Sequence, residues 1–227
     1  MHDPTDSDDN VIPIGKQTLN PSHIFYRPCS GIWQSVWIES APANHITEIQ
    51  LSAGADGSGR CPLDEYVIAD TDRSCTVNAT VYTSNNGTAD VEIKILNPDG
   101  SELASHSGSS NTALTFQADG PELWSPDSPT LYNVTVTLGD DVVSSYTAFR
   151  TISRGEVDGI QRPLLNGEFV FQFGTLDQGY WPDGLYTPPN REAMEYDLKM
   201  LKDMGFNMLR KHVSQTKRNC TAGYDAD

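Results

Sequence analysis

The stretch FQFGTLDQGYWPDGLYTPPN, residues 171–190, changes character in its middle, and this change decides how the end of the chain folds. Its first six residues are the end of an almost continuous apolar run, EFVFQFGTL (168–176). This run predicts a strand buried on both faces. A segment of acidic, amide, aromatic and turn-forming residues follows at once. A strand that ends in such a mixture indicates a loop that does more than connect two elements.

The residues PPNREAMEYDLKMLKDMGFNMLR (188–210) predict a helix and then a second strand. Asn190 can cap a helix that begins at Arg191, because the two prolines before it cannot stand inside a helix. Gly205 ends the helix, and an apolar segment follows directly. Three apolar side chains fall on one helical face: Met194, Leu198 and Leu201. Strand, loop, helix and strand together make one βαβ unit.

In such units the loops that follow the strands open on one face of the fold. The two strand ends therefore bring a set of polar and aromatic side chains to one rim: Asp177, Gln178, Tyr180, Trp181, Arg210 and His212. Aromatic rings beside carboxylate and amide groups can hold a sugar, by stacking on its C–H face and by hydrogen bonds to its hydroxyls. On the alternative interpretation, Tyr180 and Trp181 only cover the end of the fold, and Arg210 forms a structural ion pair. The residues alone leave both interpretations open.

Residues 45–152 have the pattern of an all-β domain. Six segments alternate or carry β-branched runs: HITEIQLSA, CTVNATVYT, DVEIKILN, TALTFQA, LYNVTVTL and VVSSYTAF. NPDG (97–100) and LGDD (138–141) have the composition of tight turns. This succession of short strands predicts an immunoglobulin-like sandwich. Trp124 is expected to close one end of its core, with carbohydrate stacking as the alternative role.

Residues 1–44 are too few to be stable alone, because they bury too little surface. GIWQSVWIES (31–40) predicts a strand, with Ile32, Ser35 and Trp37 among its alternately directed positions. We expect this segment to form the last strands of a domain that begins upstream. The N-terminal residues lack the apolar core of a signal peptide, and no stretch is long enough to span a membrane.

Composition restricts the partners. The chain has 31 acidic and 15 basic residues, and the net charge of −16 argues against nucleic acid as a partner. Its four cysteines have no zinc-ligand spacing, so no metal site is expected; Cys61 and Cys75 could pair across a loop or remain thiols. Four glycosylation sequons are a slight sign of secretion, at Asn78, Asn86, Asn133 and Asn219.

From Asp3 to about Val213 the chain resembles glycoside hydrolase family 2, the β-galactosidase, β-mannosidase and β-glucuronidase type. DPTDS, GKQ and SGIWQSVWIE look like the closing strands of the family's sugar-binding jelly roll. LWSPDSPTLYNVTVTL followed by FRTIS is similar to the end of its immunoglobulin-like middle domain. LNGEFVFQFGTLDQGYWPDGLYTPP and GFNMLRKH look like its first two barrel strands. The motifs most specific to the family are Leu-Trp-Ser-Pro…Pro-Thr-Leu-Tyr and the Asn-x-x-Arg at the end of the second barrel strand.

The resemblance implies a mainly β chain in three parts. Residues 1–44 would be the C-terminal remnant of the jelly-roll domain. Residues 45–152 would be the immunoglobulin-like β-sandwich, and residues 153–227 the start of a (β/α)8 TIM barrel.

The resemblance also implies a retaining hydrolase of O-glycosidic bonds, with a carbohydrate as substrate and no cofactor. Such chemistry needs a nucleophilic carboxylate and a second carboxyl as acid and base. In the family both are glutamates on later barrel strands, so this chain is expected to hold no catalytic residue and to be inactive alone, as a fragment. Asp177 and Asp183 are not assigned as replacements. The alternative is a non-catalytic β-sandwich that binds carbohydrate or protein, and the sugar is left open.

Overall fold

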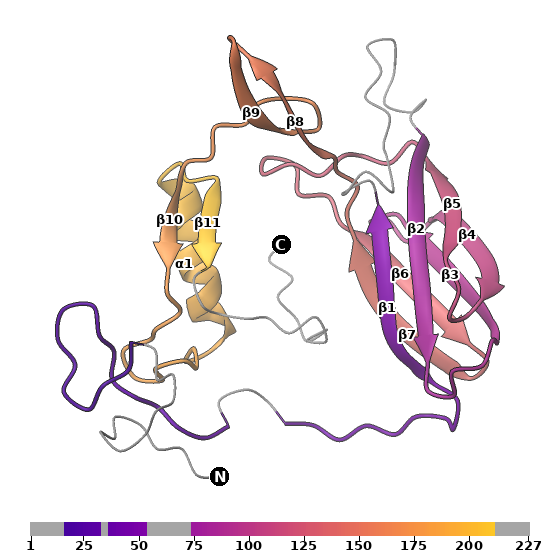
Figure 1. The fold of residues 1–227 in the computed structure, drawn as a ribbon, viewed down its shortest axis with the longest axis horizontal. Coiled ribbons are helices and arrows are strands. Elements are labelled where there is room, and N and C mark those ends of the chain that lie inside the picture. The colour runs from indigo at the N-terminus through magenta and orange to yellow at the C-terminus, as the bar shows by residue number, and fades with distance from the viewer. Residues whose placement is uncertain (1–15, 33–35, 54–73, 212–227) are drawn as a thin grey trace. The chain divides into compact units, whose positions relative to one another are not determined.

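The computed structural model describes residues 16–32, 36–53 and 74–211. They form two compact units. The larger unit contains the described residues from 40 to 171, and the smaller contains those of 16–39 and 172–211. Strands dominate, with one helix among the described residues, so the mainly β prediction is confirmed (Figure 1).

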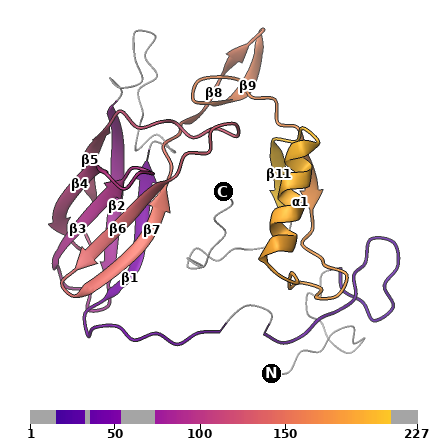
Figure 2. The same ribbon diagram turned by 180° about the vertical axis from the view of Figure 1, so that it is seen from behind.

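Seven strands of the larger unit form two antiparallel sheets. They are β1 (Ile46–Ala53), β2 (Ser74–Thr83), β3 (Asp90–Leu96), β4 (Glu102–Ser109), β5 (Leu114–Asp119), β6 (Tyr132–Leu138) and β7 (Asp141–Thr147). One sheet has the order β1-β2-β5 and the other β4-β3-β6-β7. Figure 2 shows both sheets from behind.

The two sheets share one apolar core, because alternate residues of their strands point inward. In β2 every second residue from Cys75 to Thr83 is buried, and in β6 the same holds from Tyr132 to Leu138. Ile93 of β3 is fully buried. Burial of a side chain of this size stabilises the fold by about 2 kcal/mol.

Strand β4 is the one strand of these sheets that the sequence pattern did not predict. Its sequence, ELASHSGS, is small and polar, and Ala104 is its buried residue. The strand pairs with β3 along its whole length. His106 stacks on Phe116 of β5 with 5.1 Å between the ring centroids, so β4 contributes to packing without an alternating apolar pattern.

Both predicted turns are present. In the first, the Gly100 amide donates to the Asn97 carbonyl at 2.9 Å, and the φ of 86° at Gly100 suits glycine. The second joins β6 to β7 through two residues, and Gly139 has a φ of 57°. The first residue of β7, Asp141, accepts a hydrogen bond from the Ile46 amide at 2.8 Å and so links β7 to β1.

A separate hairpin follows, formed by β8 (Ile152–Val157) and β9 (Ile160–Leu165), and the sequence pattern did not predict it. Asp158 and Gly159 have φ values of 53° and 76°, which suit a tight two-residue turn. Asn166, just after β9, holds the hairpin at its base. Its side chain accepts from the Thr151 amide and donates to the Trp124 carbonyl, both at 3.0 Å.

Trp124 is half-buried and does not belong to the core shared by the sheets. The Arg150 guanidinium lies 5.2 Å from the centroid of its ring, a cation–π contact. The expectation that Trp124 closes the core is therefore wrong, because its ring packs under an arginine at the base of the hairpin.

The cysteines differ in state. Cys75 is fully buried and disulfide-bonded, whereas Cys29 keeps its thiol. Of the pair considered from the sequence, Cys61 lies outside the described residues.

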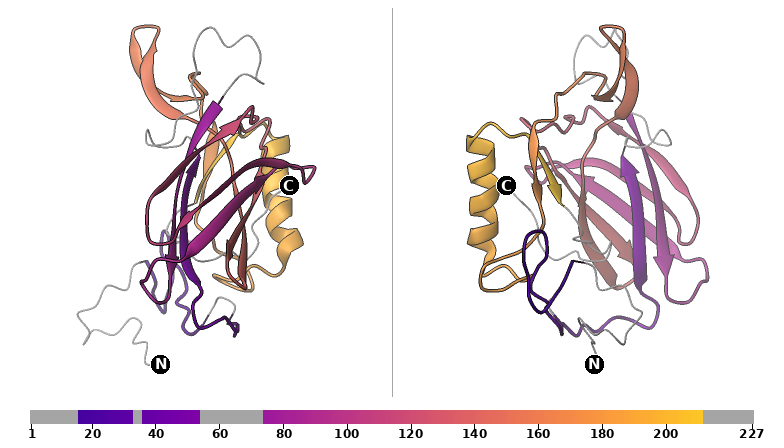
Figure 3. Two further views of the ribbon diagram at one scale, coloured as in Figure 1. Left: turned by 90° about the vertical axis from the view of Figure 1, so that its right-hand side faces the viewer. Right: turned by 60° about the vertical axis from the view of Figure 1, so that its left-hand side comes forward.

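In the smaller unit, β10 (Gly174–Asp177) pairs in parallel with β11 (Met208–Lys211), and α1 (Arg191–Asp203) connects them. The predicted βαβ unit is thereby confirmed, and Figure 3 shows α1 alongside the two strands. The Asn190 side chain caps α1 by accepting from the Ala193 amide at 2.8 Å. Gly205, with a φ of 87°, follows the C-terminal cap, as predicted.

Two residues fix the register of β10 against β11. Asn207 donates its amide to the Phe173 carbonyl at 3.0 Å and accepts from the Phe173 amide through its side chain at 2.9 Å. A Cβ on Gly174 would stand 2.1 Å from the Met208 carbonyl oxygen, so only glycine permits this close approach. The strand ends are therefore aligned by Asn207 and Gly174.

The burial predicted for the run 168–176 is wrong. Strand β10 has four residues, and Phe171, Phe173 and Leu176 are 68%, 49% and 47% exposed. Leu198, on the predicted apolar face of α1, is 40% exposed. The apolar sequence predicted that other elements pack on both faces of β10. Among the described residues, no element buries these side chains.

The strand predicted over 31–40 is also wrong for its described residues, since 31–32 and 36–40 are not in a strand. Ile32, Val36, Trp37 and Ile38 are largely exposed there. A strand needs a neighbour for its backbone hydrogen bonds, and no described strand pairs with this segment. Ser35 lies outside the described residues.

Candidate functional site

The predicted site residues that the structure describes lie at and after the ends of β10 and β11, which are side by side. Asp177 is the last residue of β10, and its register partner is Lys211, the last residue of β11. The loop from 177 to 187 follows β10 and contains most of the candidate side chains.

Asp177 forms an ion pair with Lys211. The Lys211 ammonium donates to one carboxylate oxygen at 2.6 Å, and the Gly179 amide donates to the other at 2.7 Å. Burial acts to raise the pKa of Asp177, but the hydrogen bonds from Lys211 and Gly179 outweigh it and hold the pKa below its usual value. Asp177 is therefore held as a carboxylate, which suits accepting hydrogen bonds and does not suit donating a proton.

Arg210 points away from this ion pair. Its register partner is Leu176, and successive strand residues point to opposite faces. The residue is exposed and forms no ion pair with any residue in the described part of the chain. Among the described residues, the ion pair at these strand ends is made by Lys211 and Asp177. His212 lies outside the described residues.

Gln178 and Tyr180 are held by Tyr26, which the sequence did not identify. The Tyr26 ring stacks on the Tyr180 ring at 4.0 Å with 12° between the planes, and its hydroxyl donates to the side-chain oxygen of Gln178. Tyr186 approaches Tyr180 at 4.7 Å and a tilt of 55°. Burial, with Tyr186 adding to it, raises the pKa of Tyr180 well above its usual value.

Trp181 begins a narrow turn. Its amide donates to the Leu185 carbonyl at 2.8 Å, and the Leu185 amide donates back at 3.2 Å. Asp183 lies exposed at the tip of this turn. Trp181 is half-buried, so part of its ring surface is available for an apolar contact.

The residue pattern missed Tyr26 because it stands 152 residues before Gln178. No local spacing predicts such a pair. The one available sign was indirect: an aromatic residue in a segment too short to form its own core.

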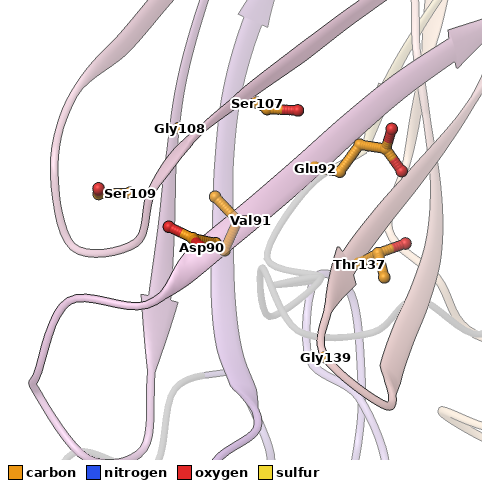
Figure 4. A pocket seen from close by; sticks show the side chains of 8 residues that line it. All are labelled: Asp90, Val91, Glu92, Ser107, Gly108, Ser109, Thr137 and Gly139. Atoms are coloured by element: carbon orange, nitrogen blue, oxygen red, sulfur yellow. The ribbon is translucent and has the colours of Figure 1, made fainter.

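A hollow of about 520 Å³ is lined by residues of β3, β4 and β6 in the larger unit (Figure 4). Asp90, Glu92 and Thr137 line it with several small residues. Glu92 is paired with Lys94 at 3.2 Å, and no predicted site residue lines the hollow.

Within the described residues, no three His, Cys, Asp or Glu side chains gather as a metal site would require. In the same part of the chain, no helix is both long and apolar enough to cross a membrane.

Comparison with known proteins identifies relatives along most of the chain. Residues 64–150 match the model of glycosyl hydrolases family 2. A protein from Formosa agariphila, named as a candidate β-glucuronidase, is 31% identical over 134 residues, which are 55% of this chain and 12% of that protein. A β-galactosidase from Staphylococcus xylosus is 23% identical over 80% of this chain and 16% of its own length. The chain thus spans less than a fifth of either relative.

Solved structures show the same likeness in fold. The β-glucuronidase of Ruminococcus gnavus superimposes with a TM-score of 0.59 at 18% sequence identity, over 75% of this chain and 26% of the enzyme. The same enzyme in complex with D-glucuronic acid matches equally well. The family match and the sequence relatives together confirm the resemblance of this chain to glycoside hydrolase family 2.

Proposed function

We propose that this chain forms part of a family 2 glycoside hydrolase that cleaves the O-glycosyl bond of a β-linked sugar. The family match over residues 64–150 carries this proposal. In the same chain, a parallel strand pair ends in the polar and aromatic side chains that a sugar site requires.

We propose the three-part architecture as well. Residues 45–152 would be an immunoglobulin-like sandwich, and the seven strands in two sheets around one core support this. Residues 153–227 would begin a TIM barrel, as the unit β10-α1-β11 suggests. Residues 1–44 would be the last part of a sugar-binding jelly roll.

The proposed substrate-binding residues have distinct tasks. Arg210 and His212 would contact the reacting sugar, with Arg210 supplying a fixed positive charge. Gln178 would donate a hydrogen bond from its amide, and Trp181 would offer its ring to the sugar's C–H face. Tyr180 would support the loop, because Tyr26 covers one face of its ring. Asp177 would stay ionised beside Lys211 and accept from a hydroxyl.

Catalysis would depend on two carboxyl groups about 5–5.5 Å apart. Asp177, paired with Lys211 and held as a carboxylate, does not suit the acid that protonates the leaving group. We therefore propose that the 227 residues alone do not hydrolyse glycosides and that the catalytic carboxyls belong to other parts of the enzyme.

The relatives' names suggest two substrate classes, β-glucuronides and β-galactosides. A proton NMR time course of the native protein with aryl β-glucuronide, β-galactoside and β-mannoside would identify the sugar released. A retaining enzyme releases the β-anomer first, and the α-anomer accumulates later by mutarotation. Release of no sugar from any of the three substrates would count against the proposed function, and first release of the α-anomer would exclude a retaining mechanism.

A further inference from the structure

The segment 16–29 contacts the loop after β10 within the smaller unit. Tyr26 is fixed from both sides by backbone hydrogen bonds: its amide donates to the Lys16 carbonyl at 2.7 Å, and its carbonyl accepts from the Thr18 amide at 3.0 Å. The Gln17 side chain accepts from the Cys29 amide at 3.2 Å. Tyr26 is thus presented on a turn closed by hydrogen bonds.

From this position Tyr26 makes two contacts with the loop. Its ring covers one face of Tyr180, with the planes 12° from parallel. Its hydroxyl donates to the side-chain oxygen of Gln178. The first contact restrains the loop by packing, and the second restrains one amide group.

The second contact has a chemical consequence. An amide side chain offers one acceptor oxygen and an NH₂ group with two donor hydrogens, and its two ends exchange places when the group rotates by 180°. In the structure the Tyr26 hydroxyl donates to the oxygen, which directs the NH₂ group away from Tyr26. No residue in the described ranges accepts a hydrogen bond from the Gln178 nitrogen. That nitrogen remains a donor, suited to a ligand oxygen.

We infer that Tyr26 is a positioning residue for the substrate site. It orders the loop 177–187 through Tyr180 and orients Gln178 as a hydrogen-bond donor to a sugar hydroxyl or carboxylate oxygen. The loop-ordering part stands on contacts within this chain, and the ligand part rests on the proposed function.

Two substitutions separate the contacts. Tyr26→Phe keeps the stacked ring and removes the hydroxyl, whereas Tyr26→Leu removes both contacts. Tyr82→Phe is the matched control, because the Tyr82 hydroxyl also donates to a glutamine oxygen, that of Gln50 at 3.5 Å, on an exposed surface of the larger unit.

Hydrogen–deuterium exchange of the 227-residue chain measures directly how far the loop 177–187 is ordered. We expect Tyr26→Leu to accelerate exchange in residues 177–187 at least about 10-fold, with Tyr26→Phe in between and Tyr82→Phe unchanged. Unchanged exchange of this loop in Tyr26→Leu would overturn the inference, whatever the protein's activity.

Steady-state kinetics of the native protein test whether Tyr26 orients Gln178. We expect Tyr26→Phe and Gln178→Ala each to raise KM about 5- to 30-fold with little change in kcat, and the double variant to be no worse than Gln178→Ala. Additive effects, or an unchanged KM in Tyr26→Phe, would overturn the orienting role. If the wild type cleaves no glycoside, the proposed function fails, while the exchange result still decides the positioning of the loop.

Discussion

The Lys211 ammonium lies 2.6 Å from the Asp177 carboxylate, across the ends of two parallel strands that are 34 residues apart in sequence. The register of β10 and β11 brings these residues opposite each other. The pair neutralises the carboxylate at the end of β10, whereas the exposed Arg210 side chain points to the opposite face of the strands.

This ion pair predicts a pH dependence of stability. The folded state holds the pKa of Asp177 below its usual value, so the pair's contribution is present above the unfolded pKa of about 3.9 and is lost as the pH falls through the folded value. Because both groups are partly exposed, we expect Asp177→Asn to cost about 0.2–1 kcal/mol at pH 7. The difference should vanish near pH 2.

Urea unfolding followed at pH 7 and pH 2 measures this difference. Asp183→Asn is the control, since Asp183 lies exposed in the same loop. An Asp177→Asn effect that persists undiminished at pH 2 would show that charge is not its cause.

A second prediction concerns Tyr132, which is 2% exposed in the core. Its hydroxyl accepts a hydrogen bond from the Glu122 amide at 2.7 Å, and its ring meets Phe149 edge-on at 5.0 Å. Tyr132→Phe keeps the ring contact and leaves the amide without its acceptor, so we expect a loss of about 1–3 kcal/mol. Thermal unfolding measures it, with the exposed Tyr146→Phe as control; equal melting temperatures for the two variants would contradict the role given to this bond.

Limited proteolysis should leave a resistant fragment that contains residues 74–150. Within the described ranges, every buried core side chain lies between Ala53 and Phe149, whereas α1 has no fully buried residue. Local opening is therefore easier in the smaller unit. Mass spectrometry of the fragments identifies the boundaries, and a resistant fragment made of residues 153–211 instead would be incompatible with this distribution of burial.

Arg210→Lys tests the proposed role of the guanidinium. In the native protein we expect kcat to fall about 100-fold or more, because lysine keeps the charge and loses the planar pair of donors. The melting temperature should stay within about 1 °C, since Arg210 forms no ion pair with the described residues. A lower melting temperature with an unchanged kcat would assign Arg210 a structural role.

Much of the larger unit could be predicted from sequence because its strands obey a two-residue period. In β2 and β6 this period coincides with burial. Strand β4 escaped prediction because small polar residues follow Leu103 and Ala104, so no apolar alternation develops. The β8–β9 hairpin escaped although Asp158-Gly159 is a turn signal, since its strands carry exposed residues such as Ile152 and Ile160.

The smaller unit shows what local sequence can and cannot determine. Asn190 and Gly205 mark the ends of α1 correctly, because capping is a local property. Burial of Phe173 and a strand at Trp37 were predicted wrongly, because both depend on neighbouring elements. Of the candidate site, the position of Asp177 at a strand end follows from sequence, whereas its pairing with Lys211 depends on the register of two strands.

The most direct test of the account is the hydrolysis of aryl β-glucuronide, β-galactoside and β-mannoside by two samples: the native protein that carries these residues and the isolated 227-residue chain. We predict turnover of at least one glycoside by the native protein and none by the isolated chain, because the chain is proposed to lack the carboxyl pair that the chemistry requires. Turnover of any of these glycosides by the isolated chain, or of none of them by the native protein, would contradict this prediction.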